Sequence, residues 1–470
     1  MKKSKMKFFS GLSLLGAGGL LANIHGAETP AADAVSAGWQ KPAWLTDLSL
    51  AAKEAYDDNV LGVAGKTPGM SPHGSLITTI SPKFGVNFAP LLGKQNILQT
   101  VSFNYTPDFT FFHNAPAESY NAHRIGDSIK GKVGDFSFLL DNAFLFNDGN
   151  SVAPTYAWSQ TGPAIDQADK FRNNYAHSMA RERRKQIQDR ATVTLQYDLH
   201  EFFVRPTASL LYYDMMTDLH NNSAAPYKGY QDYPDRADVN GGLDLGYKVT
   251  SDLAFTVGYR YGHQYQAAFP NAIDAATVHG QQMQSSSDYN RFLLGVEGQP
   301  WKWLNVRLLG GPELRSYNSA APVNDYHPVK YYGEAALTAT LTPSQTVTFA
   351  YKQWQWVSST GKIPALDSTY NLNYHWNATK QLGFDLGGRV LNIDYTSGNA
   401  TTGSAPSLRN DIEYTVSAGV SYAFTKHFSA SLAYAYDFGR NLQDNLAANL
   451  FANYREFDHQ TVSLAAQYKF

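Results

Sequence analysis

The chain has 470 residues, a formal net charge of -2 and no cysteine. The lack of cysteine excludes disulfides, thiolate chemistry and cysteine-ligated metals, and the charge gives no general attraction to nucleic acid. Its 30 Tyr and 26 Phe are high numbers for a helical protein, and its hydrophobic residues are spread too evenly for membrane-spanning helices. A soluble chain of this length tends to divide into domains, yet no composition shift marks a boundary within residues 46–470. A closed barrel, which needs no central core, fits these observations.

The N-terminus has the pattern of a secretory signal peptide. Four lysines precede an apolar run from Phe8 to about Leu21, and small residues follow. A membrane anchor is the weaker alternative, because the run is short and interrupted by glycines. Ala27 is a candidate last residue, although His25 is unusual two positions before a cleavage site. We therefore predict a signal peptide at 1–27, a periplasmic lead-in at 28–45 that is rich in Ala and Pro, and one barrel at 46–470.

Alternation of apolar and polar residues with period two predicts eighteen strands. They span 47–56, 76–89, 96–107, 121–133, 135–146, 187–198, 202–214, 237–249, 252–264, 287–298, 302–316, 328–341, 345–357, 367–376, 380–395, 409–424, 427–438 and 456–470. Several are weak, which leaves sixteen strands as the alternative. The clearest mismatch is Asp127, which falls on an apolar face; a bulge or a register shift would remove it.

The connections alternate in length along the whole chain. Short breaks, such as the one at Gly134 and Asp135, alternate with long polar stretches, such as 60–74 and 147–186. Outer-membrane barrels combine short periplasmic turns, long extracellular loops and an even strand number. Their strands must close, since open edges in lipid would leave backbone groups unpaired. The predicted fold is therefore all-β: a transmembrane antiparallel up-and-down β-barrel, wide enough at this strand number for an aqueous channel.

The last predicted strand carries the most regular pattern. One face is apolar and the other is largely polar, and the strand ends on an aromatic residue. The apolar face consists of Val462, Leu464, Ala466, Tyr468 and Phe470. This ending resembles that of bacterial outer-membrane β-barrels, the porins among them, and the run from Ser49 to Val60 resembles the opening strand of a group of porin-like barrels. The resemblance implies that Tyr468 and Phe470 form the signal for the barrel-assembly machinery.

The longest loop, 147–186, loses the strand period after about Ala164 and shows apolar residues at helical spacing. It ends in a basic cluster: Arg181, Arg183, Arg184 and Lys185. As the third long loop it occupies the position where porins commonly fold a loop into the lumen, which predicts a pore constriction that favours anions. The alternative is a solvated loop whose cations contact lipopolysaccharide phosphates.

Alternation also assigns charged residues to the lumen wall. The predicted pore-lining cations are Arg205, Lys248, Arg260, Arg291, Arg307, Arg315, Lys352 and Arg389. The acidic residues on the same faces are Asp198, Asp244, Glu297, Glu313, Glu334, Asp385 and Glu413. The basic excess favours anions, although opposite charges on neighbouring strands can simply pair.

Trp354 and Trp356 share the face of Lys352, so alternation places both indoles in the lumen. There they could stack on sugar rings. The preferred interpretation is a bulge that returns them to the aromatic girdle at the membrane surface, where Trp is common.

Catalytic patterns are weak. Gly65, Lys66 and Thr67 resemble the end of a phosphate-binding loop, but Val60 stands where its first glycine is required. Ser71 and His73 lack the surroundings of a nucleophile elbow. We therefore predict no catalytic residue, metal or cofactor.

The predicted function is an outer-membrane, porin-like channel for passive diffusion of small hydrophilic solutes, with a preference for anions. The expected partners are the lipid bilayer, lipopolysaccharide, the assembly machinery and the solutes; a homo-oligomer is compatible with the pattern. The alternative is an outer-membrane enzyme, or a plugged barrel whose loops bind a ligand.

Overall fold

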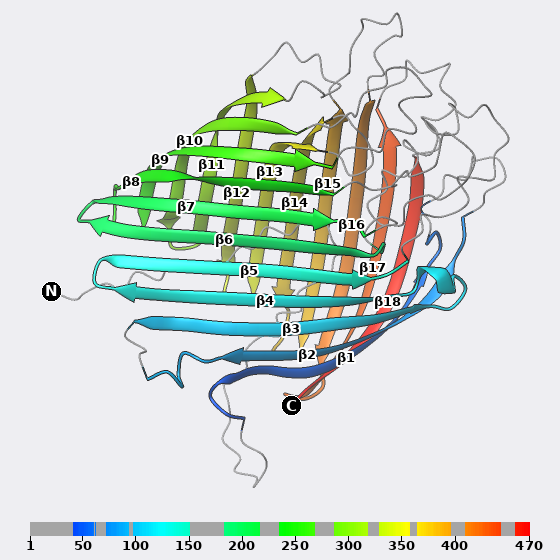
Figure 1. Cartoon of the computed structure of the whole chain (residues 1–470). Coiled ribbons are helices and arrows are strands. Elements are labelled where there is room, and N and C mark those ends of the chain that lie inside the picture. Colours follow the sequence, from blue (N-terminus) through cyan, green and yellow to red (C-terminus); the bar gives the residue numbers. More distant parts are fainter. Residues whose placement is uncertain are drawn as a thin grey trace, which may run out of the picture.

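The computed structural model is a single closed β-barrel (Figure 1). It describes residues 41–60, 62, 72–93, 97–150, 183–216, 235–267, 286–317, 329–357, 364–395, 409–442 and 456–470. Each strand pairs antiparallel with the next along the chain, and the first strand pairs with the last. The predicted signal peptide and most of the lead-in lie outside the described residues.

The barrel has eighteen strands. They are β1 (Leu45–Asp57), β2 (Ser75–Asn87), β3 (Leu98–Phe112), β4 (Tyr120–Val133), β5 (Phe136–Asp148), β6 (Gln186–Leu199), β7 (Phe202–Asp214), β8 (Arg236–Lys248), β9 (Leu253–Gln266), β10 (Ser287–Trp301), β11 (Leu304–Tyr317), β12 (Val329–Thr342), β13 (Gln345–Val357), β14 (Pro364–Asn377), β15 (Leu382–Tyr395), β16 (Arg409–Ala423), β17 (Phe428–Asn441) and β18 (Phe457–Lys469). One 3₁₀ turn, η1 (Pro116–Glu118), lies between β3 and β4. Among the described residues, no helix has the length and apolar character needed to cross a membrane.

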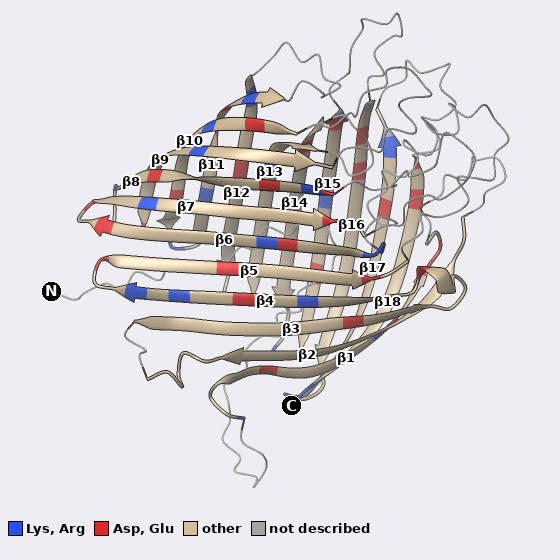
Figure 2. Cartoon of the chain, in the orientation of Figure 1, with Lys and Arg blue, Asp and Glu red and all other residues tan. Residues whose placement is uncertain are grey.

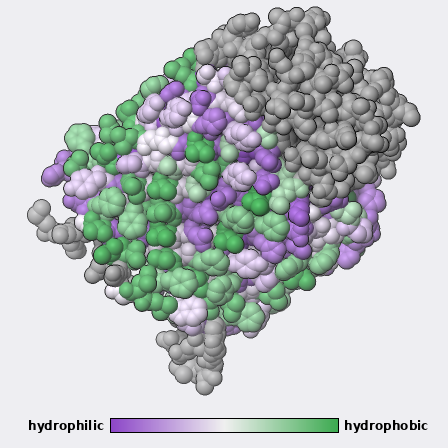
Figure 3. All heavy atoms as spheres, in the orientation of Figure 1, coloured by the Kyte–Doolittle hydropathy of each residue, from purple (hydrophilic) through white to green (hydrophobic). Residues whose placement is uncertain are grey.

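The two faces of the wall differ as period-two strands require. Large apolar side chains stand exposed on the outside: Val416 is 57% exposed and Leu464 is 59% exposed. On the face in view, apolar residues gather along the left and lower parts (Figure 3). Because closure pairs every strand and the outer side chains are apolar, the structure is a transmembrane β-barrel.

The barrel closes at a seam between β1 and β18. Leu50 lies opposite Tyr468 in this ladder, and the N–H of Phe470 donates to the Leu48 carbonyl at 2.9 Å. Within the interior, His459 of β18 lies between Asp57 of β1, at 2.8 Å, and Asp437 of β17, at 3.3 Å. The seam is therefore bonded by backbone and by buried side chains.

Short turns join the strands at one end of the barrel, called here the turn end, and long connections lie at the other, the loop end. Gly134 between β4 and β5 has φ of 57°, a left-handed conformation that costs glycine little. The predicted alternation of short and long connections holds except at β2–β3, where the turn-end connection 88–97 is longer than the loop-end connections 113–119 and 358–363.

The predicted strand number of eighteen is also confirmed, with strand ends displaced by a few residues. The largest difference is β3, which continues to Phe112 rather than ending at 107. No bulge corrects Asp127: β4 pairs with β5 without a register shift, so Asp127 stays on the outer face opposite Asn142.

Candidate functional site

Charged side chains of the inner face meet across strands that are not neighbours. Arg205 of β7 donates to Glu297 of β10 at 2.6 Å, although β8 and β9 lie between these strands. Arg205 also pairs with Asp244, which Arg260 reaches at 2.7 Å. Only the concave side of the wall allows such contacts, so Arg205 and Arg260 point into the interior.

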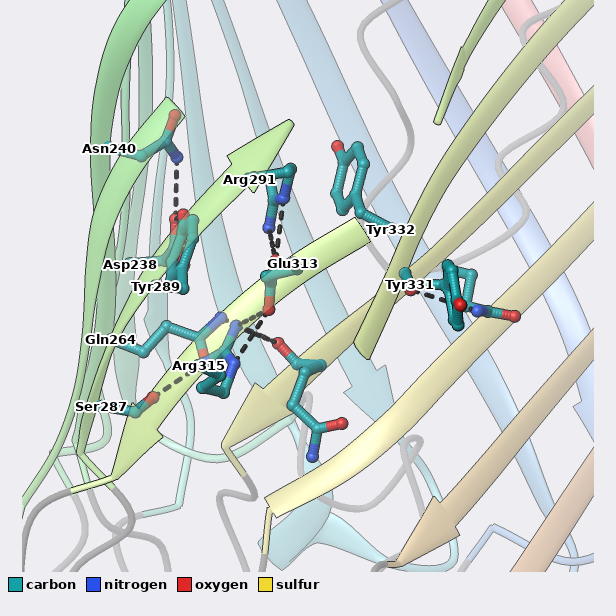
Figure 4. A network of polar contacts seen from close by, with 12 residues as sticks. Asp238, Asn240, Gln264, Ser287, Tyr289, Arg291, Glu313, Arg315, Tyr331 and Tyr332 are labelled. Carbon is teal, nitrogen blue, oxygen red and sulfur yellow. Dashed lines mark hydrogen bonds and ion pairs between the residues drawn. The ribbon is translucent and has the colours of Figure 1, made fainter. Parts of the chain in front are cut away.

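A second group lies near the loop ends of β8–β11. We call it the inner network, and it consists of Asp238, Gln264, Tyr289, Arg291, Glu313 and Arg315 (Figure 4). Glu313 stands at its centre, only 1% exposed. One carboxylate oxygen accepts from Arg291 Nε and Nη2 at 2.8 and 2.5 Å, and the other accepts from Arg315 Nε and Nη2 at 2.9 and 2.6 Å. Two arginines thus share one buried carboxylate, and charge-assisted bonds of this kind are strong.

Aromatic rings enclose the same arginines. The Arg291 guanidinium lies 3.6 Å from the centroid of the Tyr332 ring and 4.6 Å from that of Tyr289. The Tyr289 hydroxyl donates to Asp238 at 3.0 Å. Because Tyr289 is fully buried, the network is a packed part of the interior rather than a wetted surface.

Four predicted pore-lining cations lie outside these two groups. Arg307 of β11 is exposed and forms no hydrogen bond or close ion pair with another described residue, but its charge interacts with the Glu334 carboxylate of β12. Lys248 pairs with Asp198 at 3.1 Å, and Arg389 approaches Glu413 at 4.0 Å. Lys352 is half-buried, with its ammonium 3.9 Å from the centre of the Trp354 ring. In the ribbon view, basic and acidic positions often lie on neighbouring strands (Figure 2). Pairing therefore neutralises much of the predicted basic excess.

The tryptophans of β13 lie inside the barrel. Trp354 stacks on Trp356 at 4.3 Å between ring centroids. The Arg236 guanidinium lies 5.0 Å from the centroid of the Trp356 ring, and the centroid of the Tyr213 ring lies 6.3 Å from it. Tyr213 and Arg236 belong to β7 and β8, which lie six and five strands from β13 in the barrel. The expected bulge toward the outer girdle is wrong, because these contacts hold the indoles inside.

The basic cluster of the third long loop is divided. Arg183 and Arg184 are buried, and both bind Glu118 of η1, at 3.0 Å and 2.5 Å. Arg183 also donates to the Val60 carbonyl and stacks over Phe112. Lys185 lies 3.8 Å from Asp148 at a partly exposed position, and Arg181 lies outside the described residues.

The Arg183–Glu118–Arg184 cluster has a strong local field. Burial alone would raise the pKa of the Glu118 carboxyl, but the charges and hydrogen bonds of the two arginines outweigh it and lower the pKa. The cluster ties three connections together at the loop end: those after β1, β3 and β5. Arg183 and Arg184 thus act as anchors in the described structure, and their role in a constriction remains a prediction.

No protein-family model matches the sequence, and no curated protein matches it. Among solved structures, the barrel is similar to OccAB3 of Acinetobacter baumannii, with a TM-score of 0.40, 11% identity and coverage of 90% of this chain and 99% of that one. It is similar to the outer membrane protein OpdK of Pseudomonas aeruginosa, with a TM-score of 0.39, 10% identity and coverage of 90% and 99%. The siderophore receptor PirA of A. baumannii gives a TM-score of 0.38, 8% identity and coverage of 91% and 81%. Similarity at this level carries no inference about function.

Among the described residues, no group of three or more His, Asp and Glu side chains is placed to hold a metal ion. His73, singled out with Ser71, contacts the Asn114 carbonyl at 2.8 Å, while Ser71 and residues 65–67 lie outside the described structure.

Sequence reasoning missed several residues that organise the interior. Glu118, Asp238, Tyr289 and Arg236 were not singled out, and neither was His459 at the seam. Period two could have placed Arg236, Asp238 and Tyr289 on inner faces, but it carries no information on which side chains meet across the lumen.

Proposed function

We propose that the protein is a porin-like channel of the bacterial outer membrane through which small hydrophilic solutes diffuse passively. The observation that carries the proposal is the closed wall of eighteen strands with apolar residues outside and charged residues inside. Barrels of this strand number leave an aqueous channel. The mechanism is size exclusion and electrostatic screening, with no cofactor and no catalytic step.

The proposal includes export and assembly. A signal peptide at 1–27 directs the chain to the periplasm, and the assembly machinery binds the last strand. Tyr468 and Phe470, both well exposed on the outer face, supply the recognised aromatics. In the membrane, lipopolysaccharide surrounds the loop end.

A preference for anions is the finer part of the proposal, and it rests on Arg307. This guanidinium is exposed on the inner face near the turn end, whereas Arg205, Arg260, Arg291 and Arg315 are held by carboxylates. A cation beside the path that no carboxylate holds at hydrogen-bond distance attracts anions and repels cations.

The test is conductance of the refolded protein in planar bilayers, with reversal potentials measured in a salt gradient. We expect steady open steps, and a reversal potential in Arg307→Gln that moves toward cation preference. Lys302→Gln is the matched control, because Lys302 is exposed in the short turn after β10. Silent bilayers from a folded barrel would refute the channel and favour an enzyme or a plugged receptor; an unchanged reversal potential would refute the role of Arg307.

A further inference from the structure

The loop end of β13 leaves the barrel wall. From the turn end, β13 pairs with β12 as far as Gln353, which lies opposite Gly333. Beyond it, residues 329–332 of β12 pair with β11 alone, and residues 354–357 of β13 pair with β14 alone. The ladder between β12 and β13 is therefore open over the last four residues of β13, which we call the inward segment (Trp354–Val357).

Side chains of β8, β9 and β11 take the place of the missing ladder. The Gln355 carbonyl accepts from Gln264 Nε2 at 2.8 Å and from Arg315 Nη2 at 3.4 Å. The Val357 carbonyl accepts from Arg236 Nη1 at 3.0 Å. The three donors come from β9, β11 and β8, which lie four, two and five strands from β13, so the inward segment folds over the inner face of this part of the wall and is held there by its backbone carbonyls.

A stack of charged and aromatic groups reinforces this attachment. It runs from the Lys352 ammonium through the rings of Trp354 and Trp356 to the Arg236 guanidinium, with separations of 3.9, 4.3 and 5.0 Å. Cations over indole faces are attracted by the ring quadrupole, more strongly where water is excluded. The stack therefore opposes return of the segment to the wall.

The inward segment also covers the inner network. Gln264 and Glu313 are almost completely buried beneath it, although they belong to the inner face of a water-filled barrel. The Gln355 amide is buried as well, and neither of its polar atoms bonds to a described residue. An unpartnered buried amide is unfavourable, so the position of the segment is set by its carbonyls and indoles rather than by this side chain.

We propose that the inward segment, Trp354–Val357, is the constriction of the channel, and that Arg236, Gln264 and Arg315 hold it inside the wall, over the inner face of β8–β11. The inference rests on the proposed function and makes it more specific: the narrowest part of the channel is formed by the loop end of β13. The solutes that pass are those that fit beside the two indoles.

The test compares single-channel conductance in planar bilayers for the full chain and two variants. Gln264→Leu/Arg236→Met removes two of the three donors while keeping most side-chain volume. The matched control is Gln196→Leu/Arg124→Met, because both residues lie on inner faces and bond elsewhere, to Asp198 and Asp108. SDS gels show which proteins are folded barrels, because an unheated folded barrel migrates differently from the same protein after heating.

We expect conductance to rise roughly twofold or more in the donor variant and to be unchanged in the control, because conductance follows the width of the narrowest section. Trp356→Ala, which removes bulk from the segment itself, should raise conductance even if the donor variant does not fold. Equal conductance in all folded proteins would overturn the inference and leave the channel intact. If every folded protein were silent, the proposed function would fail, and the inference with it.

Discussion

Glu313→Gln tests how the inner network is stabilised. The substitution keeps the shape of the side chain but replaces one carboxylate oxygen with an NH₂ group. Each oxygen of Glu313 accepts two bonds from one guanidinium, so either Arg291 or Arg315 loses both of its bonds to this side chain. The buried trio also changes from one net positive charge to two. Breaking a buried pair by removing one partner costs about 3–5 kcal/mol.

Asp458→Asn provides the control for this prediction. The Asp458 side chain is 57% exposed and pairs with Arg440 at 2.8 Å. Exposed pairs contribute about 0–1 kcal/mol, so its loss should be barely measurable. Free energies of unfolding can be obtained from urea titrations of both variants in lipid vesicles, followed by tryptophan fluorescence. If Glu313→Gln loses no more stability than Asp458→Asn, the inner network does not contribute as argued.

Three further predictions concern the wall, the loop anchor and assembly. Leu464→Arg places a cation on the outer face at mid-height of β18 and should cost about 2–4 kcal/mol in vesicles, whereas Ser463→Arg on the inner face should cost far less; equal losses would mean that the faces are wrongly assigned. Glu118→Gln should destabilise the barrel at neutral pH. Because the pKa of Glu118 is lowered in the folded state, its contribution is complete above the ordinary value of about 4.3 and disappears as the pH falls through the lowered one, so the two unfolding curves should converge only in acid. Phe470→Ser should reduce the folded barrel recovered from cell envelopes but not refolding in vitro, with Lys469→Ser as control; an equal yield in cells would argue against an assembly signal.

Much of the fold is predictable because strands that cross lipid require a regular alternation in the sequence. A side chain faces either hydrocarbon or the interior, so period two in segments such as 409–424 and 456–470 identifies strands and faces together. The alternation of short and long connections then fixes the strand number. The end of β3 differs most from its prediction, and the strand reaches Phe112 through residues that continue the same alternation.

The contacts that shape the interior follow no such regular sequence pattern. Glu118 lies 65 positions before Arg183, and Arg236 reaches the Val357 carbonyl across 121 positions. These pairs are set by the curvature of the wall and by where two strand ends separate, and neither quantity has a local signature. The same reason explains Trp354 and Trp356: alternation placed them inside, and the mistaken preference for the girdle came from the frequency of interfacial Trp.

The seam between β1 and β18 has a consequence for biogenesis. Every other ladder joins consecutive strands, but across the seam Gln460 bonds to Asp58 over 402 positions. Pairs this distant form late, so a nascent array of hairpins keeps two unpaired edges until its final strand is available. A chain that lacks β18 would therefore be an open sheet rather than a smaller barrel. Closure of the barrel in lipid therefore requires the last strand to be present.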